Sequence, residues 1–185
     1  MSAPIDSAPA LRREELRFED IYEAHADYIW RVVQRLGVPQ ANLEDAVQDV
    51  FVVAYRKLGE FEGRSSVKTW LTGIAFRVVR DHRDKRKNER EELDEMSTAS
   101  LEPTPLAVAE RGNDLAVLDA LLAQLDAGKR EILVLADIEE LSVPEISRIL
   151  EINVNTAYSR LQVARSEFEQ AVKRFRAKEK GGARR

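Results

Sequence analysis

Apolar residues recur at spacings of three and four in three early segments, the pattern of helices with one buried face. The first segment ends before Gly37, the second begins after Asn42, a favourable N-cap residue, and the third begins near Ser66. The predicted buried positions are Phe18, Ile21, Tyr22, His25, Tyr28, Ile29, Val32, Val33 and Leu36, then Leu43, Ala46, Val47, Val50, Phe51, Ala54, Tyr55 and Leu58, then Val67, Trp70, Leu71, Ile74, Ala75, Val78 and Val79. Three such helices predict a small helical bundle.

A second set of helices follows an acidic segment without periodicity. Leucines from Leu115 onward restart the helical spacing, and Ser142 with Glu145 matches a capping box that begins a short helix over 143–150. Asn153 is placed to cap another helix, so these elements predict a helix-turn-helix. The fold class is therefore all-α, with two small helical domains joined by a flexible acidic linker. The expected divisions are an N-terminal tail over 1–13, a bundle over 14–87, a linker over 88–113, a helix-turn-helix domain over 114–175 and a basic tail over 176–185.

Charge is sorted along the chain rather than spread evenly. The 185 residues include 29 Lys and Arg against 33 Asp and Glu, a net charge of −4. Residues 64–87 nevertheless carry eight basic and two acidic side chains, and residues 156–185 carry nine and three. Two such basic blocks suit a polyanion, although solvated helix faces would give the same count. We expect the positive charge from Lys173 onward to be unstructured and to add nonspecific phosphate binding.

Both basic helices present a polar face with chemistry suited to nucleic acid. In the third helix, the residues opposite the apolar stripe are Thr69, Thr72, Phe76, Arg80, Arg83 and Lys87. Cations there would hold phosphates, and an exposed Phe76 ring would stack on a base. In the last helix, Asn155, Ser159 and Gln162 face away from the apolar stripe, with Thr156, Tyr158, Arg160 and Arg165 on the flanks. Asn, Gln and Arg read base edges in the major groove. A helical hairpin with a solvated polar face remains the alternative.

The sequence argues against catalysis, secretion and membrane insertion. His25 and His82, the two histidines, lie at or beside apolar stripes, where core packing is expected, and no nucleotide-binding glycine loop is present. We therefore expect no enzyme activity, no cofactor and no small-molecule substrate. The absence of Cys favours a reducing compartment, and no leader or long apolar run is found, so a cytoplasmic protein is expected.

Two stretches in a fixed order carry a family resemblance. The first is Asp45-Ala46-Val47-Gln48-Asp49-Val50-Phe51, and the second runs from Phe61 to Leu71 and reads FEGRSSVKTWL. Followed by the basic helix, the linker and the helix-turn-helix, they make the chain resemble, over residues 16–172, the small bacterial sigma factors of the extracytoplasmic-function (ECF) group. The alternatives are a helix-turn-helix regulator that does not join polymerase and a protein-binding helical adaptor.

The resemblance implies partners and a role for each matching residue. Core RNA polymerase would be bound by Asp45, Gln48, Asp49, Val52 and Arg56. The separated strand of the promoter's −10 element, with one base extruded into the loop over 60–66, would be contacted by Arg64, Ser65, Ser66, Lys68, Thr69, Trp70, Thr72, Phe76, Arg77, Arg80 and Arg83. Promoter DNA at the −35 element would be contacted by Asn155, Thr156, Tyr158, Ser159, Arg160, Gln162 and Arg165. An anti-sigma factor would be the regulatory partner.

Four positions depart from the family's usual pattern. Arg77 replaces a common Asn, Glu151 and Asn155 replace two glycines near the turn, and Tyr158 replaces a common Lys. These departures bear on the promoter sequence preferred and on the geometry of the turn. Glu151 is the most unusual of them, because a left-handed backbone is costly for residues other than Gly, Asn and Asp.

Overall fold

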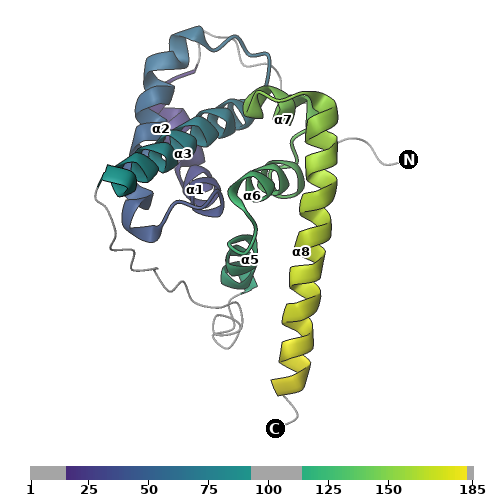
Figure 1. The fold of residues 1–185 in the computed structure, drawn as a ribbon. Helices are drawn as coiled ribbons and strands as arrows, with labels where there is room; N and C mark the ends of the chain where they lie inside the picture. Colours follow the sequence, from purple (N-terminus) through teal and green to yellow (C-terminus); the bar gives the residue numbers. More distant parts are fainter. Residues whose placement is uncertain (1–15, 93–113, 183–185) are drawn as a thin grey trace.

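The computed structural model describes residues 16–92 and 114–182, and every regular element in this part of the chain is helical. The first domain contains α1 (Phe18–Arg35), the 3₁₀ turn η2 (Gln40–Asn42), α2 (Leu43–Lys57), the 3₁₀ turn η3 (Leu58–Glu60) and α3 (Val67–Glu92). The second contains α5 (Asp114–Leu122), α6 (Ala127–Leu133), the π-helical segment η4 (Val134–Ile138), α7 (Val143–Leu150) and α8 (Val154–Gly182). The predicted all-α fold class is confirmed (Figure 1).

The helices α1, α2 and α3 pack into the bundle expected from their apolar stripes. Ile29, Leu43 and Leu71 are among its fully buried side chains, and each such burial contributes about 1.5–3 kcal/mol. Gly37 makes the turn after α1 with a φ of +101°, a backbone conformation that glycine adopts without strain. Asn42 stands at the predicted N-cap of α2, but its side chain makes no capping hydrogen bond.

The second domain packs α5, α6 and α7 against the long helix α8. Its core includes the fully buried Leu122, Ile132 and Ile146. Helix α6 is capped by Asp126, whose carboxylate accepts the backbone N–H of Lys129 at 3.0 Å. It then continues directly into η4, where the ladder widens to the i→i+5 pattern.

The turn between α7 and α8 has the local chemistry predicted for a helix-turn-helix. Glu145 accepts the backbone N–H of Ser142 at 2.9 Å, so the capping box is formed and α7 has the expected bounds. Glu151 then takes the left-handed conformation with φ 56° and ψ 40°. Asn153 accepts the backbone N–H of Asn155 at 2.8 Å and caps α8 as expected.

Two helices are longer than the sequence pattern indicates. Helix α3 continues to Glu92, past residue 88 where the linker was expected to begin. Helix α8 continues to Gly182, so the expectation that the basic segment from Lys173 is unstructured is wrong up to that residue. Strong helix formers such as Lys, Arg, Ala and Glu extend both ends, and they do so without an apolar stripe. The expected N-terminal tail over 1–13 and the linker residues 93–113 lie outside the described residues.

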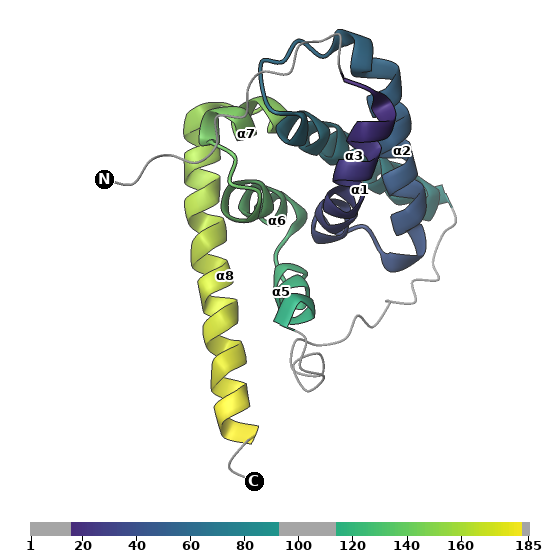
Figure 2. The same ribbon diagram turned by 180° about the vertical axis from the view of Figure 1, so that it is seen from behind.

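The second domain lies against the first in this structure. Both ribbon views show α6 and α7 between α8 and the α1–α3 bundle, with the start of α3 close to α7 (Figure 1, Figure 2). A Cβ placed on Gly73 of α3 would lie 3.7 Å from Cγ1 of Ile149 in α7, which is ordinary van der Waals contact. The sequence pattern predicted both domains but not this contact between them.

Candidate nucleic-acid interface

The exposed side of α2 carries a compact polar face. Its members all lie on one side of the helix, with each one three or four residues from another, and all are exposed: Asp45, Gln48, Asp49, Val52 and Arg56. Oδ2 of Asp49 lies 2.7 Å from Nε2 of His82 in α3, which ties this face to the next helix. The expectation that His82 packs in the core is therefore wrong, since its side chain is 27% exposed and pairs with a carboxylate.

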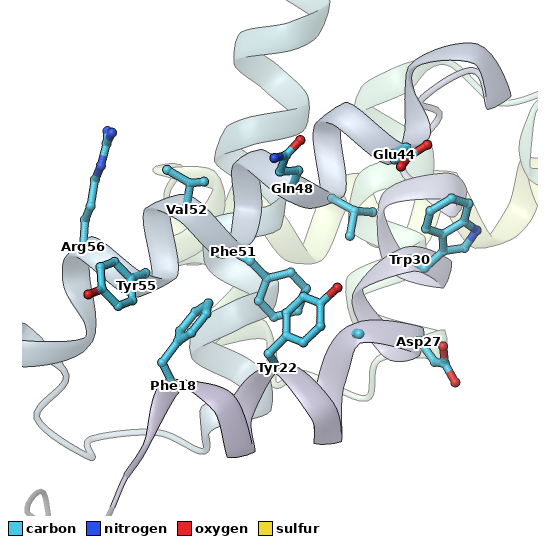
Figure 3. Close-up of a pocket in the computed structure, with 12 residues that line it drawn as sticks. Phe18, Tyr22, Asp27, Trp30, Glu44, Gln48, Phe51, Val52, Tyr55 and Arg56 are labelled. Carbon is cyan, nitrogen blue, oxygen red and sulfur yellow. The ribbon is translucent and has the colours of Figure 1, made fainter.

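A groove of about 1170 Å³ lies between α1 and α2 beside this face (Figure 3). Aromatic rings line it, with the Tyr22 and Phe51 centroids 4.7 Å apart and those of Phe18 and Tyr55 5.1 Å apart. Tyr22 and Tyr55 are 48% and 65% exposed, so their predicted burial is wrong. Periodicity alone could not predict this groove, because a tyrosine at an apolar position of a helix is compatible with either a buried core or a solvent-exposed surface. The groove shares with the α2 face Gln48, Val52 and Arg56.

The segment before α3 is an exposed turn that leads into a capped helix. Gly63 has a φ of +69°, and the neighbouring Arg64 pairs with Glu62 at the surface. The hydroxyl of Ser66 accepts the backbone N–H of Thr69 at 3.0 Å, which fixes where α3 begins. Arg64 and Ser66 are exposed, whereas Ser65 and Thr69 are half-buried. The turn therefore presents an arginine and hydroxyls next to a helix N-terminus, a geometry that suits phosphate.

Lys68 and Trp70 occupy the first turn of α3. The Lys68 ammonium lies 4.7 Å from the centroid of the Tyr28 ring, a cation–π arrangement, while its side chain stays 49% exposed. Trp70 is half-buried with its ring 5.0 Å from Phe61, in line with its expected place at the border of the core. Burial lowers the pKa of His25, and the charge of Lys68 lowers it further.

The middle of the polar face of α3 is covered rather than open. Thr72 is fully buried and Phe76 is 3% exposed, so the expectation of an exposed Phe76 ring is wrong. The Thr72 hydroxyl donates to the Lys68 carbonyl at 2.9 Å and lies 2.7 Å from the Tyr28 hydroxyl. Burial raises the pKa of Tyr28 above its usual range, so the phenol stays protonated. The remaining predicted residues are Arg77, which is exposed, and Arg80 and Arg83, which are half-buried.

The first turns of α8 present an open polar face. Asn155, Thr156, Tyr158, Ser159, Gln162 and Arg165 are exposed, and Arg160 is half-buried. The Ser159 hydroxyl donates to the Asn155 carbonyl at 3.0 Å, within the helix. Nε of Arg165 donates to Oδ2 of Asp137 at 3.0 Å. The guanidinium must therefore give up this carboxylate before it can bind a DNA phosphate or base. The exposed Asn155, Gln162 and Arg165 carry the side-chain types that read base edges in the major groove.

Over 16–92 and 114–182, no group of three or more His, Cys, Asp or Glu side chains is arranged to hold a metal ion. Within the same two ranges, no helix is both long enough and apolar enough to cross a membrane.

A bundle with a basic helix, followed by a helix-turn-helix whose reading face is exposed, defines a two-domain helical protein of the DNA-binding class. Two family profiles match in the same order, Sigma-70 region 2 over residues 21–89 and Sigma-70, region 4 over residues 115–168.

Known proteins align along most of the chain. ECF RNA polymerase sigma factor SigC of Mycobacterium tuberculosis is 30% identical, with 80% of this chain and 78% of SigC covered. RNA polymerase sigma factor CnrH of Cupriavidus metallidurans is 28% identical, with 88% and 90% covered. The structure of the sigma factor RpoE in complex with the anti-sigma factor NepR from Bartonella quintana matches with a TM-score of 0.70 at 24% identity, covering 84% of this chain and 96% of that one.

The chain belongs to the ECF family of RNA polymerase sigma factors. Members of this family are transcription initiation subunits that bind core RNA polymerase and promoter DNA. Membership confirms the resemblance found in the sequence, and it favours a sigma factor over a helix-turn-helix regulator that does not join polymerase.

Proposed function

We propose that this sigma factor docks on core RNA polymerase through the α2 face, Asp45, Gln48, Asp49, Val52 and Arg56. The observation that carries this proposal is that all five are exposed on one side of one helix, beside an aromatic groove. Exposed apolar surface next to charged residues is the composition of a protein-binding site with an apolar centre and a polar rim. The role is non-catalytic, because positioning alone selects the promoter.

The turn over 60–66 and the helix α3 are proposed to capture the −10 strand. Arg64, Ser65, Ser66, Lys68 and Thr69 surround the turn that would receive an extruded base, and Trp70 lies next to it. Thr72 and Phe76 follow along α3, and Arg77, Arg80 and Arg83 beyond them would contact the strand's phosphates. Holding a base out of the stack costs a few kcal/mol, which phosphate and stacking contacts must offset.

Helix α8 is proposed to read the −35 element from the major groove. The exposed first turns supply Asn155, Thr156, Tyr158, Ser159, Arg160, Gln162 and Arg165. Asn155 and Gln162 are suited to bidentate contacts with adenine, whereas the arginines are suited to guanine or phosphate. Because Asn155 and Tyr158 depart from the family pattern, the preferred promoter sequence is expected to be particular to this chain.

Regulation by an anti-sigma factor in the cytoplasm completes the proposal. The matched RpoE structure is a complex with the anti-sigma factor NepR, which supports a partner of this kind for the present chain. The exposed groove and α2 face are available to such a protein, and it would compete there with polymerase.

In vitro transcription tests the docking face directly. Gln48→Lys with Asp49→Lys places two cations on the α2 face and should abolish both co-purification with core polymerase and transcript initiation, while leaving the circular dichroism spectrum unchanged. Ser166→Lys with Gln170→Lys adds cations at exposed positions of α8 and serves as the matched control. Unchanged binding of polymerase by the α2 variant would remove the basis of the assignment.

Strand capture is tested separately from duplex binding. Arg77→Ala with Arg80→Ala should reduce the permanganate reactivity of unpaired thymines in the holoenzyme–promoter complex. Duplex capture through the −35 element should persist, because α8 is untouched. Equal reactivity in the variant and the parent protein would reject α3 as the strand-binding helix.

A further inference from the structure

Exposed apolar side chains on α8 are confined to its first three turns. Val154 is 37% exposed, Tyr158 is 55% exposed and Val163 is 48% exposed. Along the rest of the described part of this helix, the large apolar side chains are half-buried: Phe168, Val172 and Phe175. The apolar exposure therefore coincides with the segment of α8 that is proposed to read the −35 element.

Val163 lies among the polar residues of this reading segment. Asn155, Ser159 and Val163 are spaced by four residues, so they form one row along the exposed side of the helix. The neighbouring Gln162 and Ser166 are exposed as well. Because helical side chains lean toward the N-terminus of their helix, the isopropyl group of Val163 extends toward the turn that carries Ser159. The row thus begins with an amide and ends with an apolar group.

The free domain gains little from a valine at this exposed position. Valine is a weaker helix former than alanine, because its branched Cβ restricts the side-chain rotamers. About half of its surface also remains in water. Single exposed apolar residues are common on protein surfaces, but Val163 differs from them in lying on a face otherwise suited to base edges.

The major groove offers one apolar group to such a side chain. Thymine presents its C5-methyl group there, whereas the edges of the other bases present hydrogen-bond donors and acceptors. An isopropyl group packs well on a methyl group but leaves the amino group of a cytosine without a partner, which is costly once water is excluded. Val163 therefore has the chemistry to favour thymine and to disfavour cytosine.

We propose that Val163 reads a thymine of the −35 element through the C5-methyl group of that base. The inference rests on the proposed role of α8 in −35 recognition, and it adds one letter of sequence that the polar residues leave undetermined. Asn155 and Val163 are eight residues apart, which is about 12 Å along the helix axis. The thymine is therefore expected within about four base pairs of an adenine read by Asn155.

Replacement of thymine by deoxyuridine tests the methyl contact. The preferred −35 sequence is first selected from random duplexes with the holoenzyme formed by the full chain and core polymerase. Each thymine of the selected duplex is then replaced in turn by deoxyuridine, which pairs in the same way but lacks the methyl group, and the dissociation constant is measured by competition. One of these replacements should weaken binding by about fourfold, the effect of one methyl group that is no longer buried.

Val163→Ala links this effect to the side chain. The variant should bind the thymine duplex about fourfold more weakly than the parent protein, and at the responsive position it should bind thymine and deoxyuridine equally well. A 5-methylcytosine in place of cytosine at that position should strengthen binding by the parent protein but not by the variant. Gln170→Ala, at an exposed position further along α8, is the matched control and should keep the parent's response.

Several results would overturn the proposal. These are a selected −35 element without thymine, equal binding of the thymine duplex and every deoxyuridine duplex by the parent protein, and a response to deoxyuridine that is unchanged in Val163→Ala. A lowered thermal unfolding midpoint of Val163→Ala together with unchanged duplex binding would show that Val163 serves only the packing of the domain, which also overturns it.

Failure of the underlying −35 role gives a different result. Asn155→Ala with Gln162→Ala should change the selected sequence if α8 reads the −35 element. If this double variant changes the sequence while Val163→Ala keeps the parent's response, the role of α8 stands and only the reading of thymine by Val163 falls. If neither variant changes the selected sequence, both proposals fall.

Discussion

Replacing Glu151 by glycine should stabilise the helix-turn-helix domain. Glu151 closes α7 in the left-handed conformation at φ 56° and donates its backbone N–H to the Ser147 carbonyl. The left-handed conformation costs a residue with a Cβ about 1–2 kcal/mol. Glycine avoids that cost but gives back roughly 0.5–1 kcal/mol through its greater freedom in the unfolded chain. Taking the middle of each range, the expected net gain is about 0.75 kcal/mol.

Differential scanning calorimetry of the full chain measures this gain. For a domain of this size the gain corresponds to a rise of roughly 3–6 °C in the unfolding midpoint of the second domain. Ser166→Gly, at an exposed position inside α8, is the matched control and should lower the midpoint, because glycine weakens a helix interior. A midpoint for Glu151→Gly that stays level or falls would show that the Glu151 side chain stabilises the turn by more than its backbone costs.

Three further predictions concern stability. Glu145→Ala removes the acceptor of the Ser142 N–H and should cost about 1 kcal/mol in urea unfolding, whereas Glu145→Gln should keep most of it. Leu71→Ala, in the core of the first bundle, should cost about 2–5 kcal/mol, against under 0.5 kcal/mol for the exposed Leu115→Ala. Because burial lowers the pKa of His25 below its ordinary 6.5, the contribution of His25 to folding stability should be full above pH 6.5 and decline as the pH falls below it. His25→Gln should make the urea midpoint fall less steeply over this pH range. An unchanged dependence of the midpoint on pH would contradict the prediction.

The sequence predicted helix ends correctly where they depend on hydrogen bonds between residues close in the chain. The capping box of α7 and the Asn153 cap of α8 are formed by the predicted residues, because their acceptors lie within three residues. The buried stripe of α2 was likewise predictable apart from Tyr55, whose ring suits either environment. The exposed α2 face followed from the family resemblance together with that stripe.

Contacts between segments far apart in the chain were not predictable from periodicity. Phe76 lies opposite the apolar stripe of α3, where the helical pattern predicts exposure, yet it is buried. His82 meets Asp49 across two helices, and Glu131 meets Arg83 across two domains. Each of these features depends on how whole helices pack against one another, and the periodicity of a single helix carries no information about that packing.

The π-helical segment η4 connects two contacts of the second domain, one with helix α8 and one with the first domain. Asp137, inside the widened turn, binds Arg165 on α8, the helix proposed to read DNA, whereas Glu139, the residue after η4, reaches Lys68 and Arg35. Two acidic residues separated by a single position thus point to opposite partners. Engagement of Arg165 by a promoter phosphate would release Asp137 and remove one restraint on the turn that also carries Glu139. A deletion within this short segment would rotate both carboxylates and uncouple the two contacts.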